Sequence, residues 1–84
     1  MDEQQDRFLA AVYAAQGKTD RAGVLDITAQ LGLDIINSKE DRDLYQETTL
    51  GFRDAGYIDC LANDYSVTCG IVKLTPQGIS YLES

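Results

Sequence analysis

Residues 38–58 read SKEDRDLYQETTLGFRDAGYI, and this stretch decides how the rest of the chain is arranged. Ser38 and Asp41 predict a helix start, because a hydroxyl and a carboxylate can satisfy backbone N–H groups that have no partner in a first turn. Gly56 predicts the end of the helix, and the residues from there to Ile58 predict the beginning of a strand. We therefore expect one long amphipathic helix that runs through a glycine directly into a strand.

The larger side chains of this helix recur at steps of three and four residues, the spacing that places side chains on one face. That face should be buried against the rest of the domain. Its predicted members are Leu44, Tyr45, Thr48, Phe52 and Ala55. Leu50 lies off this face, so we expect it to point away from the core.

The length and charge of the chain restrict its function. Its 84 residues predict a single domain, 1–84, that is too small for a deep cleft between domains. Fourteen Asp and Glu against seven Lys and Arg give a net charge of −7, which argues against general affinity for phosphate backbones or anionic membranes. The polar, acidic start and the lack of a long apolar run predict a cytoplasmic protein with no membrane segment. The two cysteines should then be reduced thiols.

Glycines and turn residues divide the rest of the chain. Asp2 or a neighbour predicts the start of a first helix that ends near Gln16, and Thr19 or Asp20 predicts the start of a second helix that ends at Gly32. A hairpin should follow the long helix, in two strands. We expect its turn at Asn63 and Asp64, its second strand within residues 65–75, a bulge at Gly70, and a last short helix beginning at Thr75-Pro76.

Three segments in this order resemble the winged helix-turn-helix family. They are Ala29-Gln30-Leu31-Gly32-Leu33, then Phe52-Arg53-Asp54-Ala55-Gly56-Tyr57-Ile58, then Leu74-Thr75-Pro76-Gln77-Gly78-Ile79-Ser80-Tyr81-Leu82-Glu83. The resemblance implies an α+β fold: a three-helix bundle, a two-stranded β-hairpin wing and a short C-terminal helix. In DNA-binding members of the family the third helix enters the major groove. Other winged helices are protein-interaction modules and dimerisation units.

Enzymatic chemistry has little support in the sequence. The chain has no histidine, so it lacks the usual general base, metal ligand and partner for a nucleophile. Gly17-Lys18-Thr19 resembles the end of a phosphate-binding loop, but Val12 stands where that loop needs another glycine. Cys60 and Cys69 cannot complete a tetrahedral zinc site. They would face each other across the hairpin, where a redox bond is one interpretation and two small apolar residues on its inner face is the favoured one. We predict no catalytic residue, no cofactor and no metal.

The outward surface of the long helix carries both signs of charge. One edge can contact phosphates and bases, and the neighbouring edge would be repelled by them. The first edge consists of Lys39, Arg42, Gln46, Thr49 and Arg53, and the second of Glu40, Asp43, Glu47 and Asp54. A solvated helix face laced with opposite charges is the alternative to any binding role.

The predicted hairpin tip, residues 63–66, contains no Lys or Arg that could hold a DNA backbone. We therefore predict a small non-enzymatic regulatory or adaptor module that binds another protein or a second copy of itself. Its docking surface would have Leu50 at the centre and charged residues around it, namely Asp43, Glu47, Asp54 and Arg53. A DNA-binding transcriptional regulator that uses residues 38–55 as its recognition helix is the alternative. No small-molecule substrate is evident.

Overall fold

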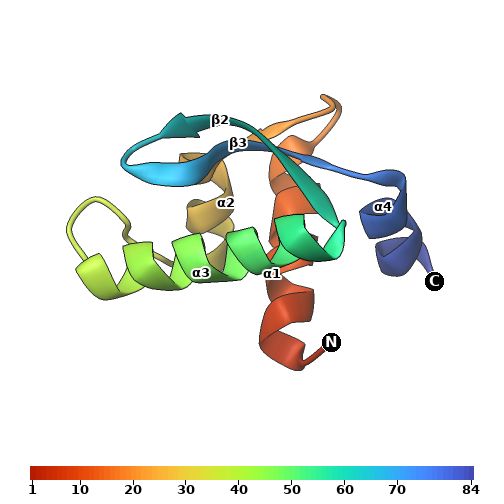
Figure 1. Cartoon of the computed structure of the whole chain (residues 1–84), viewed down its shortest axis with the longest axis horizontal. Coiled ribbons are helices and arrows are strands. Elements are labelled where there is room, and N and C mark those ends of the chain that lie inside the picture. The colour runs from red at the N-terminus through yellow and green to blue at the C-terminus, as the bar shows by residue number, and fades with distance from the viewer.

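The computed structural model describes residues 1–84 and has an α+β fold with four helices and a three-stranded antiparallel sheet (Figure 1). The helices are α1 (Glu3–Gln16), α2 (Val24–Leu31), α3 (Lys39–Ala55) and α4 (Pro76–Glu83), and the strands are β1 (Ala22–Gly23), β2 (Ile58–Asp64) and β3 (Val67–Leu74). In the sheet the strands lie in the order β1-β3-β2. This arrangement is consistent with a winged-helix-like fold. None of the helices is long and apolar enough to cross a membrane.

The predicted limits of the first and third helices are confirmed. The Asp2 carboxylate accepts a hydrogen bond from the backbone N–H of Gln5, and the Ser38 hydroxyl accepts one from the N–H of Asp41. Gly56 ends α3 with φ of 88°, a left-handed conformation that favours glycine. Local capping chemistry alone therefore fixes these boundaries.

The start predicted for the second helix, Thr19 or Asp20, is wrong. The helix begins at Val24, because Ala22 and Gly23 form β1 and pair with Val72 and Ile71 of β3. A two-residue strand has no periodicity of its own, and its partner lies about fifty residues later in the chain. The predicted two-stranded hairpin is therefore part of a three-stranded sheet.

The hairpin of β2 and β3 lies across α3, and its tip reaches the N-terminal half of that helix (Figure 1). Its turn is at Tyr65 and Ser66, both with positive φ, two residues beyond the predicted Asn63 and Asp64. The pairing of the strands shifts twice between Cys60 and Asp64, and Gly70 lies opposite the second shift, so the predicted irregularity is confirmed. A Cβ on Gly70 would lie 2.3 Å from the backbone nitrogen of Asp64, which excludes a side chain there.

The core lies between the sheet and the helices. α1 packs against α2, whereas α3 packs chiefly against β3 and β2. The three helices therefore do not form the closed bundle that was expected, because the sheet supplies most of the contacts of α3. Tyr45 and Phe52 are buried as predicted, but Ala55 is exposed and Thr49 is buried. The buried apolar side chains include Phe8, Leu9, Val12, Val24, Ile27, Ile35, Ile58, Val67, Val72 and Leu74.

The C-terminal helix is fixed at the junction of α3 and β2. The Thr75 hydroxyl accepts a hydrogen bond from the N–H of Gly78 and donates one to the carbonyl of Gly56, at 2.6 Å. A Cβ on Gly78 would lie 2.3 Å from the carbonyl oxygen of Tyr57, so the first turn of α4 rests directly on the backbone.

Candidate functional site: the outer surface of α3

The loop before α3 positions the helix through one carboxylate. Asp34 accepts hydrogen bonds from the backbone N–H groups of Ile36 and Asn37 and from the Asn37 amide. These bonds, chiefly those from Asn37, hold the pKa of Asp34 below its usual value. The N–H of Asp34 in turn donates to the Asp41 carboxylate in the first turn of α3, at 2.8 Å. The loop and the helix start are therefore one hydrogen-bonded unit.

The inward side of α3 is centred on Tyr45 and Thr49, each with no exposed surface. The Tyr45 hydroxyl donates to the carbonyl of Cys69 on β3, at 2.7 Å, and burial raises the pKa of this phenol. The Thr49 hydroxyl donates to the carbonyl of Tyr45, at 2.7 Å. Thr49 is therefore not a DNA-contacting residue. The prediction was wrong because a threonine that satisfies its hydroxyl within its own helix can be buried like an apolar residue.

The edge of α3 that faces the hairpin is hydrogen-bonded to β3. The Gln46 amide forms two hydrogen bonds with Thr68 of β3: its nitrogen donates to the Thr68 hydroxyl at 2.8 Å, and its oxygen accepts from the Thr68 N–H at 2.9 Å. Arg42, one turn earlier, is half-buried. Gln46 was predicted to face outward and contact bases. It instead holds the end of the hairpin on the helix, a role that the sequence of α3 alone does not reveal.

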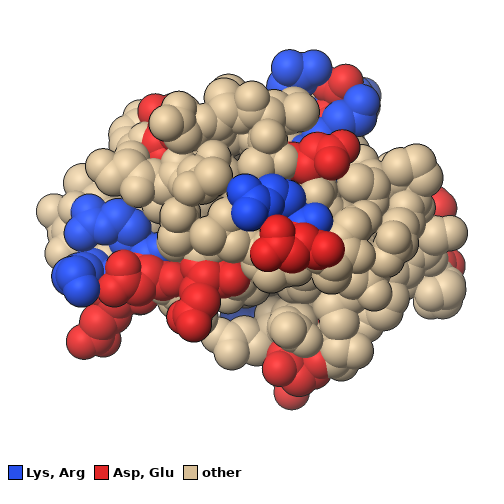
Figure 2. Space-filling view, in the orientation of Figure 1, with Lys and Arg blue, Asp and Glu red and all other residues tan.

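Four carboxylates line the side of α3 away from the core, and we call them the acidic strip. All four are exposed, and they recur at the spacing of one helix face. The members of the acidic strip are Glu40, Asp43, Glu47 and Asp54. Figure 2 shows Asp and Glu side chains along the helix with Lys and Arg side chains directly above them, on the side of the hairpin.

The exposed cations of α3 are paired with this strip. The Lys39 ammonium lies 3.3 Å from the Asp43 carboxylate, one turn along the helix, and the Arg53 guanidinium lies 3.2 Å from that of Asp54. Both pairs are exposed, so each contributes little to stability. They nevertheless place opposite charge beside two of the three cations that were predicted to contact DNA. Glu40 and Glu47 have no cationic partner within 4.0 Å.

Leu50 does not lie free on the surface. It is half-buried and packs against the hydrophobic core, so the expectation that it points away from the core is wrong. The helix packs against the hairpin on one side and contacts α1 on the other. More of its circumference is therefore buried than the spacing of the apolar residues indicated. The next residue, Gly51, is exposed, and a Cβ there would meet no atom within 4 Å.

An open groove with a mixed polar and apolar lining runs between this outer surface and the start of α1. It is lined on the α3 side by Glu47, Thr48, Gly51 and Ala55, and on the α1 side by Met1, Asp2, Gln4 and Gln5. Phe52 and Tyr57 contribute to its floor. The groove therefore borders the acidic strip, because Glu47 belongs to both.

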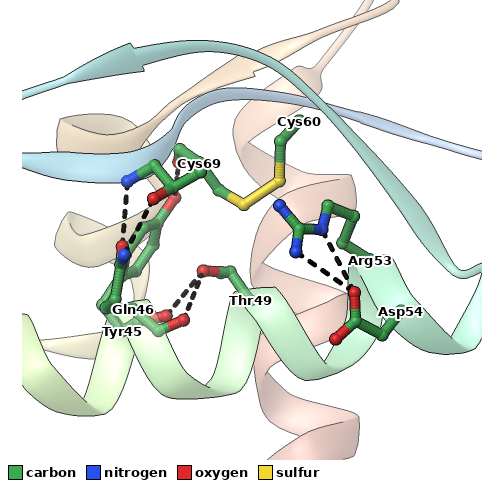
Figure 3. Close-up of a disulfide and its surroundings, with 8 residues drawn as sticks. Tyr45, Gln46, Thr49, Arg53, Asp54, Cys60 and Cys69 are labelled. Carbon is green, nitrogen blue, oxygen red and sulfur yellow. Dashed lines mark hydrogen bonds and ion pairs between the residues drawn. A yellow bond between two sulfur atoms is a disulfide. The ribbon is translucent and has the colours of Figure 1, made fainter.

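Cys60 and Cys69 form a disulfide bond, so the prediction of reduced thiols is wrong. Their Cα atoms lie 4.8 Å apart although Cys60 pairs with Val72 in the ladder, because the strand pairing shifts directly after Cys60. Figure 3 shows the disulfide on the side of the hairpin that faces α3, above Thr49 and Arg53. The sequence interpretation that assigned these cysteines to the inner face of the hairpin is confirmed for Cys69, which has no exposed surface.

The acidic side chains do not gather into a metal site. No group of three or more His, Cys, Asp or Glu side chains is placed to hold a metal ion. The outer surface of α3 therefore remains the most distinctive polar feature of the chain. No protein-family model, curated protein or solved structure matches this chain, so its function is argued from this surface itself.

Proposed function

We propose that this chain is a small non-enzymatic module of the winged-helix type that binds another protein, or a second copy of itself, through the outer surface of α3. The observation that carries the proposal is the acidic strip. Its four carboxylates are exposed on one helix face beside an open groove. Two of the four, Glu40 and Glu47, have no cationic partner within 4.0 Å. Unpaired carboxylates favour partners of the opposite sign of charge and speed their encounter.

The centre of this surface differs from the one expected from sequence. Asp43, Glu47 and Asp54 stay in the proposed docking surface, with Arg53 at its edge. Leu50 drops out of the centre because it packs against the core. Gly51 takes its place, and a glycine there lets a partner approach the helix backbone closely.

The alternative function, a DNA reader, has less support. Its proposed contacts were Lys39, Arg42, Gln46, Thr49 and Arg53. Two of the five side chains are turned to internal hydrogen bonds and two are paired with carboxylates, which leaves the half-buried Arg42. DNA affinity depends on cations that displace counterions from phosphates, and this surface offers few of them.

The proposal can be tested with a synthetic cationic peptide of alternating Lys and Ala as the probe. The test variant is Asp43→Asn with Glu47→Gln and Asp54→Asn, and the control variant is Asp26→Asn with Asp59→Asn and Glu83→Gln at exposed positions elsewhere. Each removes three negative charges, from −7 to −4. We expect the test variant to weaken binding by about fivefold or more and the control by less than about twofold. Equal losses would contradict a site on α3.

Self-association is tested by sedimentation at increasing protein concentration. In a two-fold dimer, Arg53 of one copy would meet Asp43 or Glu47 of the other. This contact requires Arg53 to leave its exposed pair with Asp54, which costs little. If a dimer forms, Arg53→Ala should weaken it, whereas Arg7→Ala on α1 should not. A dimer that is insensitive to Arg53→Ala would place the self-association surface elsewhere.

A further inference from the structure

We propose that the Cys60–Cys69 disulfide is a redox switch that determines whether the two strands of the outer part of the hairpin, residues 61–68, stay together. This inference goes beyond the proposed docking function and does not depend on it. It rests on where the disulfide lies in the hairpin, on the different exposure of its two sulfur-bearing residues, and on what else holds the hairpin to the helix.

The disulfide stands at the boundary between a regular and an irregular part of the hairpin. From Ile58 to Cys60 the strands pair residue by residue, whereas beyond Cys60 only Ala62 and Asp64 have partners and the register shifts twice. Every residue from 61 to 66 is exposed. Apart from the buried Val67, the outer hairpin therefore has little burial, and it has few ladder bonds to keep its strands together. These are the properties of a segment that opens locally.

The disulfide joins β2 to β3, and other contacts hold β3 against α3. The Gln46 amide forms two hydrogen bonds with Thr68, and the buried Tyr45 hydroxyl donates to the carbonyl of Cys69. Val67 of β3 is buried in the core. The disulfide is therefore a covalent link between the two strands at the point where their regular pairing ends, and breaking it acts directly on the outer hairpin.

The two cysteines differ in access. Cys60 is partly exposed, whereas Cys69 has no exposed surface. A thiolate of an external dithiol reductant would therefore attack the sulfur of Cys60. A mixed disulfide forms between the reductant and Cys60 as the S–S bond breaks, and Cys69 leaves with the electron pair and takes up a proton.

The second thiolate of the reductant then attacks the reductant's first sulfur, which is bonded to Cys60 in the mixed disulfide. The Cys60 sulfur leaves as a thiolate and is protonated. Two electrons and two protons pass to the chain, and the reductant becomes a disulfide. Cys60 and Cys69 are the only cysteines of the chain, so neither can form a disulfide with a third cysteine of the same chain. In the reduced chain β3 is still held on α3 by buried Val67 and by the hydrogen bonds from Gln46 and Tyr45. The outer strands then keep only the pairs made by Ala62 and Asp64.

Amide hydrogen exchange of the full chain, read by mass spectrometry, tests the switch. After treatment with dithiothreitol we expect exchange in residues 61–68 to accelerate on the order of tenfold or more, while exchange in α1 changes by less than about twofold. Oxidised glutathione should restore the slow exchange. The variant Cys60→Ala with Cys69→Ala should exchange rapidly in residues 61–68 and should not respond to dithiothreitol.

Three results would overturn the proposal. If exchange in residues 61–68 does not respond to dithiothreitol, the disulfide does not hold the hairpin. If α1 loses its protection at the same time, the disulfide is a cross-link on which the entire fold depends and not a local switch. If Gln46→Ala releases the oxidised hairpin as far as reduction does, the hydrogen bonds to Thr68 and not the disulfide control its position.

Discussion

Phe52 is the side chain on which the junction between α3 and the hairpin depends. It is 4% exposed and its ring packs edge-on against that of Tyr57, with centroids 6.3 Å apart. Phe52→Ala leaves a cavity that the surrounding helix and strand cannot fill, so it should lower the free energy of unfolding by about 3–5 kcal/mol. The measurement is a urea melt. Leu61→Ala, on the exposed outer face of the hairpin, is the control and should change it by less than about 0.5 kcal/mol.

Tyr45 links stability to alkaline pH. Burial raises the pKa of its phenol above the usual 10.0, so the folded chain keeps the proton at a pH where the unfolded chain releases it. The stabilisation is fully present below about pH 10 and is lost as the pH rises further. The chain should therefore lose stability progressively as the pH rises above about 10. Part of the loss comes from Tyr81, whose pKa is raised by its hydrogen bond to Asp6.

Two tyrosine variants separate the contribution of Tyr45. Tyr45→Phe leaves the carbonyl of Cys69 without its buried donor, so it should cost about 1–3 kcal/mol at neutral pH. It should also flatten the alkaline loss of stability. Tyr13→Phe, at an exposed position on α1, should do neither. If urea melts of Tyr45→Phe show the wild-type dependence on alkaline pH, the phenol of Tyr45 is not the group that couples to it.

At the scale of elements, what the sequence predicted was set by local chemistry. Ser38, Gly32 and Gly56 begin or end helices through bonds within a few residues, and their positions could be read directly. β1 could not, because Ala22 and Gly23 become a strand only by pairing with β3. The turn lies within the predicted tip, residues 63–66, but Asn63 and Asp64 were wrongly chosen as its central residues. Tyr65 and Ser66 adopt positive φ without the Asn or Gly that usually marks such a turn.

The candidate site was also predicted only in part, because helix spacing is local whereas some of the side-chain partners are distant in the sequence. The four carboxylates of the acidic strip share a face by helix spacing alone, and the structure places all of them on the surface. Gln46 and Thr49 were assigned outward because both are polar, yet their partners are Thr68 on a distant strand and a carbonyl of their own helix. A polar residue that finds an internal partner carries no signal of burial in the sequence.

The two helical glycines provide a matched test of how elements approach one another. Gly51 lies in the middle of α3 with open space around it, so Gly51→Ala should stabilise the domain by about 0.5–1 kcal/mol through helix propensity. Gly78 lies in α4 against the carbonyl of Tyr57, and Gly78→Ala should cost about 1–3 kcal/mol because that helix must shift. The change in melting temperature should have opposite signs in the two variants. The same sign in both would contradict the contact between α4 and Tyr57.

For the whole molecule, the decisive quantity is the distribution of a net charge of −7. The cations of α3 are few, and the nearest charges to them are the carboxylates of the acidic strip. The hairpin adds one cation, Lys73, which lies 3.7 Å from the Asp20 carboxylate at the base of the sheet and not at the tip. A duplex placed along α3 would therefore meet repulsion at the helix and no compensating charge at the hairpin tip.

The last prediction concerns DNA. Fluorescence anisotropy with a labelled duplex of mixed sequence should show no measurable binding at physiological salt, and only weak binding that is insensitive to sequence at low salt. Asp43→Asn with Glu47→Gln and Asp54→Asn should raise the low-salt affinity more than Asp26→Asn with Asp59→Asn and Glu83→Gln does, although both variants carry the same net charge. The reason is local: neutralising the acidic strip removes repulsion where a duplex would lie along α3, and neutralising distant carboxylates does not. An equal rise in both variants would mean that total charge, not the strip, keeps DNA away. Tight binding to one sequence at physiological salt that collapses with Arg42→Ala would identify α3 as a recognition helix and contradict the protein-binding proposal.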